Sequence, residues 1–191
     1  KSLDNTIEPS ELTDKYGSDA LRMGLLVGVG PGADNNLGES KVKAYRNFSN
    51  KIWNATRFVL MSLPEDYQHN KVKITADDQS LLNELQSVIS DITDDIENYR
   101  LHLASEKLYS YFWHTFADKI IESKKDLVGN NHDPDNPASL SAAYTLYEIL
   151  TTCLIALHPF MPFVTEEIWR DLPGISDKTM LLVTRWPRYD D

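Results

Sequence analysis

Apolar residues recur at three- and four-residue spacing through most of the chain, which predicts helices rather than strands. A short helix is also expected in "VTEEIWRDL", with Thr165 as its N-cap, and "TMLLVTRWP" is expected to be extended. The pattern predicts an all-α fold, an antiparallel helical bundle. The four long helical patterns cover approximately residues 39–62, 77–100, 104–128 and 140–157.

The N-terminal part is rich in turn-forming residues and predicts an irregular lead-in to the bundle. "EPSELTDKYG" places Pro9 at a first helical position and Gly17 at a stop, and "SDALRMGLLVGV" predicts a second short helix. A loop rich in Gly, Asn and Pro follows, up to Ser40. We therefore divide the chain into a connecting segment, residues 1–37, and a helical domain, residues 38–191.

Charge changes this picture, because it is distributed unevenly. The chain has 29 acidic and 19 basic residues and a net charge of -10, which argues against a general nucleic-acid binder. However, no Asp or Glu occurs between Lys41 and Pro64. The second long pattern carries much of the negative charge, and we expect its acidic residues to lie on a solvated outer face. They are Asp77, Asp78, Glu84, Asp91, Asp94, Asp95 and Glu97.

The carboxylate-free stretch from Lys41 to Pro64 carries the residue types that bind single-stranded RNA. Cations contact phosphates, planar groups stack on bases, and amides read base edges. Two other interpretations remain open from the residues alone. Trp53 belongs to a wide apolar face, or Arg46 and Arg57 pair with acids of the second helix. The outward stripe consists of Lys43, Arg46, Asn50, Trp53 and Arg57, and Asn47, Lys51 and Asn54 flank it.

The sequence contains no recognisable catalytic or metal-binding constellation. None of the five histidines has a Glu three residues before it, as a di-iron bundle requires, and no Cys/His cluster suits zinc. The single cysteine, Cys153, lies in an apolar run and is expected to be buried. No apolar run reaches about 18 residues, so we expect a cytoplasmic protein without a membrane span. A binding domain is therefore favoured over an autonomous enzyme.

Several stretches resemble class I aminoacyl-tRNA synthetases. "YRNFSNKIWNATRFVLM" is similar to the helix that opens the anticodon-binding domain of valyl-tRNA synthetases. "YGSDALR" resembles a segment of class I synthetases, and "HPFMPFVTEEIW" is similar to a segment of the valyl, isoleucyl and leucyl group. "TRWP" resembles the end of the same domain, and these matches occur in the expected order. The resemblance extends from Lys1 to Pro187 and favours the valyl enzymes. An isoleucyl- or leucyl-type domain, or a helical protein–protein interaction bundle, is the alternative.

The resemblance implies a tRNA-binding fragment of a ligase that joins valine to its tRNA using ATP. The upstream catalytic domain of the same chain is then a partner, and no DNA, membrane or metal partner is expected. Lys1 and Ser2 correspond to the last two residues of the ATP-binding KMSKS motif, where Lys1 would stabilise the leaving pyrophosphate. Asp4 stands where the family usually has Gly. The fragment alone is expected to be inactive. The expected tRNA contacts are Lys43, Arg46, Asn50, Lys51, Trp53, Asn54 and Arg57.

The "HPFMPFVTEEIW" segment is expected to be structural rather than catalytic. Phe160, Phe163 and Trp169 are expected in the core, because large aromatic side chains dominate buried area. Glu166 and Glu167 are expected to cap a helix or to pair with the basic helix.

Overall fold

The computed structural model of this chain describes residues 8–30, 32–34, 37–64, 72–129, 136–175 and 179–188. Regular secondary structure in these ranges is entirely helical, which confirms the predicted all-α fold. The α-helices are α1 (Pro9–Tyr16), α2 (Ser18–Leu26), α3 (Glu39–Met61), α4 (Ala76–Glu97), α5 (Leu101–Ser110), α6 (Ile121–Val128), α7 (Pro137–Leu157) and α8 (Pro162–Arg170). A π-helical segment η2 (Tyr111–Ile120) and a 3₁₀ turn η3 (Leu181–Val183) complete the described elements.

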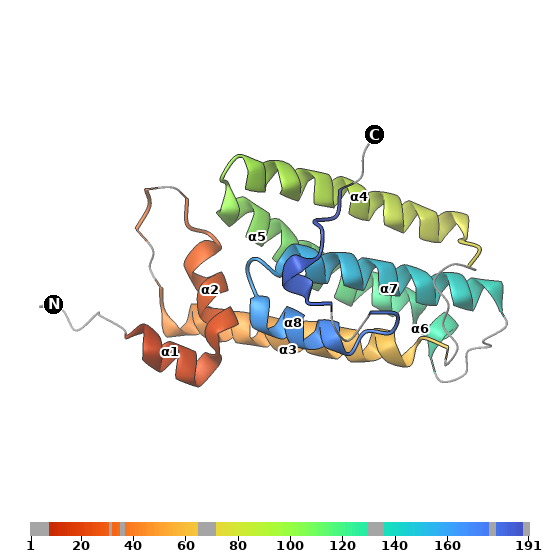
Figure 1. Cartoon of the computed structure of the whole chain (residues 1–191), viewed down its shortest axis with the longest axis horizontal. Coiled ribbons are helices and arrows are strands. Elements are labelled where there is room, and N and C mark those ends of the chain that lie inside the picture. Colours follow the sequence, from red (N-terminus) through yellow and green to blue (C-terminus); the bar gives the residue numbers. More distant parts are fainter. Residues whose placement is uncertain are drawn as a thin grey trace, which may run out of the picture.

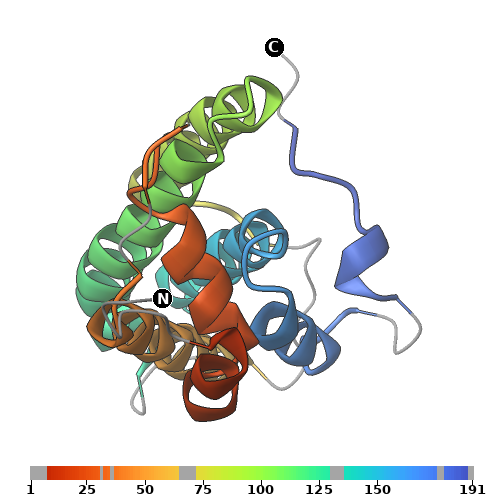
Figure 2. The ribbon, with the colours of Figure 1, turned by 90° about the vertical axis from the view of Figure 1, so that its left-hand side faces the viewer.

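The bundle has two outer helices with opposite chemical character, α3 and α4. Figures 1 and 2 show them on opposite sides of the molecule, with α7 between them. Helix α7 packs against α3, α4, α5, α6 and α8. By length and composition it could cross a membrane, but 72% of its apolar window is buried inside the bundle. A core helix of a soluble protein has the same composition, so this feature is weak evidence for a membrane span.

Local capping explains where two long helices begin. Helix α4 starts after Thr75, whose hydroxyl accepts a hydrogen bond from the Asp78 N–H. Helix α7 starts at Pro137, three residues before the apolar pattern predicted, because Asn136 caps it by accepting from the Ala138 N–H. Polar caps thus extend helices beyond their apolar stripes.

Helices α5, η2 and α6 form one continuous rod, as the single apolar pattern over 104–128 predicted, although the rod begins earlier, at Leu101. Its middle ten residues are π-helical, a wider turn that the three- and four-residue spacing did not predict. Here Phe112 packs edge-on against Phe48 of α3, with ring centroids 5.8 Å apart. Aromatic packing therefore fixes the rod against α3.

The two N-terminal helices pack onto the bundle. Helix α2 contacts α3, α5 and α8, and α1 contacts α3. Helix α2 comes close to α3 at Gly24, where an added Cβ atom would lie 3.5 Å from Val42 Cγ2 of α3 and 3.1 Å from Cδ1 of Leu37, which precedes α3. Leu12 and Met23 join the common core. The division of the chain at residues 37 and 38 stays a prediction, and these contacts hold both parts in one packed unit.

The core also contains the single cysteine. Cys153 lies on α7 and is 1% exposed, which confirms that it is a buried hydrophobic residue. Burial raises the pKa of its thiol. A thiol that stays protonated is a poor nucleophile.

Candidate nucleic-acid interface

The outward side of α3 carries all seven predicted RNA contacts. Val42, Phe48, Ile52 and Val59 on the inward side are fully buried, so the 3.6-residue period turns the polar residues outward. The indole of Trp53 is 40% exposed, which argues against the interpretation of this residue as core. Lys51 is half-buried. The six exposed members are Lys43, Arg46, Asn50, Trp53, Asn54 and Arg57.

Two of the seven residues are tied to neighbouring helices. The Arg46 guanidinium donates a hydrogen bond to the main-chain oxygen of Lys15 on α1, at 2.9 Å. The Lys51 Nζ atom lies 2.6 Å from an Asp118 carboxylate oxygen on η2 and above the ring of Trp113. The possible pairing of arginines with acids of the second helix is not observed in the described ranges, because α4 lies across the bundle from α3.

The other five residues have no internal partner among those the structure describes. Their side chains make no hydrogen bond or ion pair with any described residue. Exposed polar side chains without a partner contribute little to folding stability. These side chains can therefore contact another molecule without breaking an internal contact. We name this set the α3 face: Lys43, Asn50, Trp53, Asn54 and Arg57.

The seven predicted contacts do not form one cluster. Lys51 and Asn54 turn toward the rod and line a groove with Ile121 and Lys125 of α6. Arg46 turns toward α1. The structure thus leaves an open stripe on α3 with a groove along one edge, an arrangement that depends on which helices neighbour α3.

Helix α4 shows the contrasting chemistry. Five of its acidic residues are exposed, as predicted, but Asp78 and Asp95 are buried, which corrects the expectation of a wholly solvated face. Asp78 lies 2.6 Å from the Lys124 ammonium nitrogen. Asp95 pairs with Arg100 at 2.7 Å and Lys107 at 2.6 Å. Burial raises the pKa of Asp95, but the hydrogen bonds from these two cations outweigh burial and hold it below its ordinary value.

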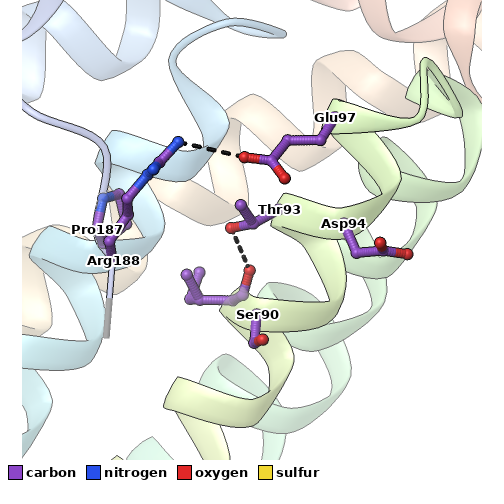
Figure 3. Close-up of a pocket in the computed structure, with 7 residues that line it drawn as sticks. Ser90, Thr93, Asp94, Glu97, Pro187 and Arg188 are labelled. Atoms are coloured by element: carbon purple, nitrogen blue, oxygen red, sulfur yellow. Dashed lines mark hydrogen bonds and ion pairs between the residues drawn. The ribbon is translucent and has the colours of Figure 1, made fainter. Parts of the chain in front are cut away.

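The C-terminal tail lies across the exposed side of α4. The Trp186 indole donates to the Thr93 hydroxyl at 2.8 Å, and Arg188 lies 3.2 Å from a Glu97 oxygen. Beside these contacts is a cavity of about 250 Å³, with Asp94 and Glu97 among its lining residues (Figure 3). Its carboxylates would repel phosphates, so this cavity is a poor RNA site.

A separate set of polar residues joins α2 to α8. The Asp19 carboxylate accepts hydrogen bonds from the main-chain N–H groups of Phe163, at 3.2 Å, and Val164, at 2.7 Å. It therefore caps the N-terminus of α8 from another helix. Arg22 donates to the main-chain oxygens of Pro159 and Phe160. The "SDALR" and "HPFMPF" segments are thus two halves of one contact.

The contact continues into α8. The prediction of Thr165 as the N-cap of this helix is wrong. The helix begins at Pro162, and Thr165 is buried inside it, donating to the Met161 oxygen at 2.8 Å. The His158 Nδ1 atom lies 2.9 Å from the Thr165 hydroxyl oxygen. Burial lowers the pKa of His158, although nearby Glu166 opposes the shift. We name this set the α2–α8 junction: Asp19, Arg22, His158 and Thr165.

The acidic residues of α8 do not reach the basic helix. The Glu166 carboxylate accepts from the N–H groups of Leu181, at 3.1 Å, and Leu182, at 3.2 Å, and so holds the C-terminal tail. Glu167 lies beside Arg170 of its own helix. The expected pairing of these two glutamates with α3 is therefore wrong, whereas the expectation of a cap holds for Glu166.

The three aromatic residues of this segment divide between core and surface. Phe160 and Trp169 are buried, as predicted. Phe163 is 65% exposed, which corrects its assignment to the core. The main-chain N–H of Phe163 donates a hydrogen bond to Asp19, which holds the backbone in place while the ring points away from the core.

The predicted ATP-site residues, Lys1 and Ser2, lie outside the described residues. Within the ranges that are described, no group of three or more His, Cys, Asp or Glu side chains could hold a metal ion.

Comparison with known families gives this surface a context. The family described as "Anticodon-binding domain of tRNA ligase" matches residues 78–191. This match covers more than half of the chain, and the chain belongs to that family. Helix α3 precedes the matched range.

The chain is also similar to particular ligases. It is 39% identical over 194 residues to a valine–tRNA ligase of Clostridium acetobutylicum and 38% identical over 195 residues to that of Clostridium tetani. Both alignments cover all of this chain but only 22% of the ligase, so the chain spans about a fifth of the length of these relatives.

A solved structure shares the fold. It is a LeuRS–tRNA–LeuAMS ternary complex from Agrobacterium radiobacter K84, with a TM-score of 0.68. The match covers 98% of this chain and 21% of that one, at 22% sequence identity. The bundle and its lead-in therefore share the fold of the matched part of that LeuRS chain.

Proposed function

We propose that this chain is the tRNA-binding part of a valine–tRNA ligase, and that the α3 face contacts the tRNA. The whole enzyme would join valine to its tRNA using ATP in the cytoplasm. Its upstream catalytic domain would act as partner to this bundle and would share Lys1 and Ser2 in ATP binding. The role of the described bundle is recognition, and the isolated chain is inactive as a ligase.

The observation that carries this proposal is that the side chains of the α3 face have no partner among the described residues. A protein with a net charge of -10 keeps one helix free of carboxylates between Lys41 and Pro64. Lys43 and Arg57 are exposed there without an ion pair to any described residue. Each carboxylate placed on this surface would repel an approaching phosphate, whereas each free cation would attract one.

Lys51 fits the same role despite its ion pair. The side chains of Lys51 and Asp118 are 31% and 43% exposed, and exposed pairs contribute roughly 0–1 kcal/mol. An RNA phosphate can therefore replace Asp118 at small cost. Trp53 adds a flat surface on which a base can stack, a contact of about 1–3 kcal/mol.

Titration with a valine-tRNA transcript tests the proposal. The logarithm of the association constant should fall linearly with the logarithm of the salt concentration, because RNA binding releases counterions. Arg57→Ala should reduce this slope by about one. The control is Arg185→Ala, which removes an exposed arginine from the C-terminal tail. Binding that ignores salt, or equal effects of the two variants, would refute the role of α3.

Valine specificity needs a second comparison. Transcripts of valine, isoleucine and leucine tRNA should be compared at one salt concentration. We expect the valine transcript to bind most tightly. Equal binding of all three would leave the RNA role intact and overturn the assignment to valine.

A further inference from the structure

A charged cluster lies where the π-helical segment η2 passes beside α3, next to the α3 face. One carboxylate oxygen of Asp118 lies 2.6 Å from the Lys51 ammonium nitrogen, and the other lies 3.7 Å from Nδ1 of His114. Asp118 therefore stands between a lysine of α3 and a histidine of its own helical segment. We name these three side chains the Asp118 cluster.

The Asp118 cluster is open to solvent and is positioned by aromatic rings. His114 is 58% exposed, and its ring packs edge-on against Tyr109 of α5, with centroids 6.1 Å apart. The Lys51 ammonium nitrogen lies 5.7 Å from the centroid of the Trp113 ring, which attracts the cation. The Trp113 ring thus holds Lys51 at this surface even when Asp118 releases it.

In the free chain, Asp118 occupies the position beside Lys51 that an RNA phosphate would take. A carboxylate and a phosphate both bind an ammonium group through anionic oxygens. Asp118 also places a negative charge at the edge of the α3 face, where it repels RNA. The pair is partly exposed and weak, but it has to be replaced before Lys51 can bind a phosphate.

Protonation of His114 changes the net charge of the cluster. With a neutral imidazole the charges of Lys51 and Asp118 cancel, and with an imidazolium the cluster has a net positive charge. Histidine is the side chain that ordinarily changes its charge between about pH 5 and 8. The other titratable groups that the structure describes around His114 are Asp118, Lys51 and Tyr109. Tyr109 stays neutral in this range, because burial raises the pKa of its hydroxyl.

We infer that Asp118 and His114 form a pH-dependent gate on RNA binding by Lys51. At neutral pH, Asp118 holds Lys51 and competes with the RNA phosphate. Below about pH 6.5, the imidazolium neutralises Asp118 and the phosphate takes its place at Lys51. The inference rests on the proposed function and deepens it, since it gives the RNA-binding surface a regulator within the same chain.

Four variants test the gate by titration with the valine-tRNA transcript at pH 7.5 and pH 5.5, at one salt concentration. Asp118→Asn removes the competing charge and keeps the shape of the side chain. His114→Asn removes the group that gains a proton, and Lys51→Met removes the gated cation. The control is His158→Gln, which removes a buried histidine of the α2–α8 junction. Thermal unfolding at both pH values checks that each variant is folded.

The gate predicts a gain of binding from the loss of an ion pair. Asp118→Asn should bind the transcript about threefold more tightly than wild type at pH 7.5, the scale of an exposed ion pair, and should gain little on acidification. Wild type should bind about threefold more tightly at pH 5.5 than at pH 7.5. His114→Asn and Lys51→Met should lose this effect of pH, whereas His158→Gln should keep it.

Three results would each overturn the gate. The first is binding of Asp118→Asn at pH 7.5 that is no tighter than wild type. The second is an effect of pH that survives in His114→Asn, because another group then causes it. The third is an effect of pH that survives in Lys51→Met, since His114 would then contact the phosphate itself.

The proposed function fails on different results. If the gate is overturned but Arg57→Ala still reduces the salt slope, the α3 face binds RNA and is not regulated by Asp118 and His114. If the wild-type chain binds no transcript at either pH, both proposals fail.

Discussion

The α2–α8 junction and the α3 face are both polar, and their polar groups are used in opposite ways. At the junction Asp19 is 7% exposed and binds two main-chain N–H groups, and Thr165 is fully buried. On the α3 face Asn50 and Arg57 are exposed and lack a partner among the described residues. Both regions lie in segments with the same family resemblance, so resemblance alone does not separate structural residues from binding residues.

Whether a polar group has an internal partner distinguishes structural residues from binding residues. Removing the partner of a buried hydrogen-bond donor lowers the free energy of unfolding of the protein by about 1–3 kcal/mol. An exposed residue without a partner can be replaced within roughly 0.5 kcal/mol. Junction variants should therefore change folding, and α3-face variants should change RNA binding.

The largest effect is expected from Asp19→Ala. It leaves the N–H groups of Phe163 and Val164 without their acceptor and should lower the free energy of unfolding by about 3 kcal/mol. Urea denaturation measures this. Asp14→Ala, an exposed aspartate on α1, is the control and should change stability by less than about 0.5 kcal/mol. Weaker tRNA binding per folded molecule of Asp19→Ala would break the distinction between the two regions.

Trp53→Ala is the counterpart on the α3 face. Loss of a stacking surface should weaken tRNA binding by about 2 kcal/mol, or roughly thirtyfold. The effect on stability should be smaller, since 40% of the side chain is already exposed. Anisotropy titration and urea denaturation of the same samples compare the two effects. A variant that unfolds readily but binds tRNA normally would place Trp53 with the structural residues.

A pH effect on stability between pH 7.5 and 5.5 is expected at the junction. Burial lowers the pKa of His158 against the opposing charges of Glu166 and Asp19, and Arg22 lowers it further. The unfolded chain therefore binds a proton below about pH 6.5 that the folded chain does not. Stability should fall as the pH drops from 7.5 to 5.5. His158→Gln should remove this part of the slope, and an unchanged slope would show that other groups cause it.

The smallest effects are expected at Arg46, which shares features of both regions. Its hydrogen bond to Lys15 ties α3 to α1, yet its side chain is exposed. Arg46→Ala should lower stability by about 0.5–1 kcal/mol and reduce the salt slope of tRNA binding by less than one. Arg46→Lys should restore most of the slope. An effect on stability alone would assign Arg46 to the fold.

The sequence predicted the helices and the outward side of α3 because both depend on local period. Buried residues of α3 repeat along one face, so their polar neighbours had to point outward. The partners of those neighbours depend on adjacent helices, and the period carries no such information. For this reason the bond from Arg46 to Lys15 and the pair between Lys51 and Asp118 were not foreseen.

The junction was missed for the same reason. Asp19 and Val164 are 145 residues apart in the chain, and only the packing of α2 against α8 brings them together. Likewise, the helical pattern of α4 indicated which residues are polar. It did not indicate that Asp78 and Asp95 would be buried and paired with Lys124 and Lys107.

A matched pair of isosteric charge changes tests the central claim most directly. Asn50→Asp adds one negative charge to the α3 face, and Gln86→Glu adds the same charge to exposed α4 on the opposite side. At low salt, Asn50→Asp should weaken binding of the valine-tRNA transcript about fivefold, with the difference narrowing as salt rises, and Gln86→Glu should change it less than about twofold. Equal effects of the two substitutions, or no effect of Asn50→Asp, would contradict tRNA binding by the α3 face.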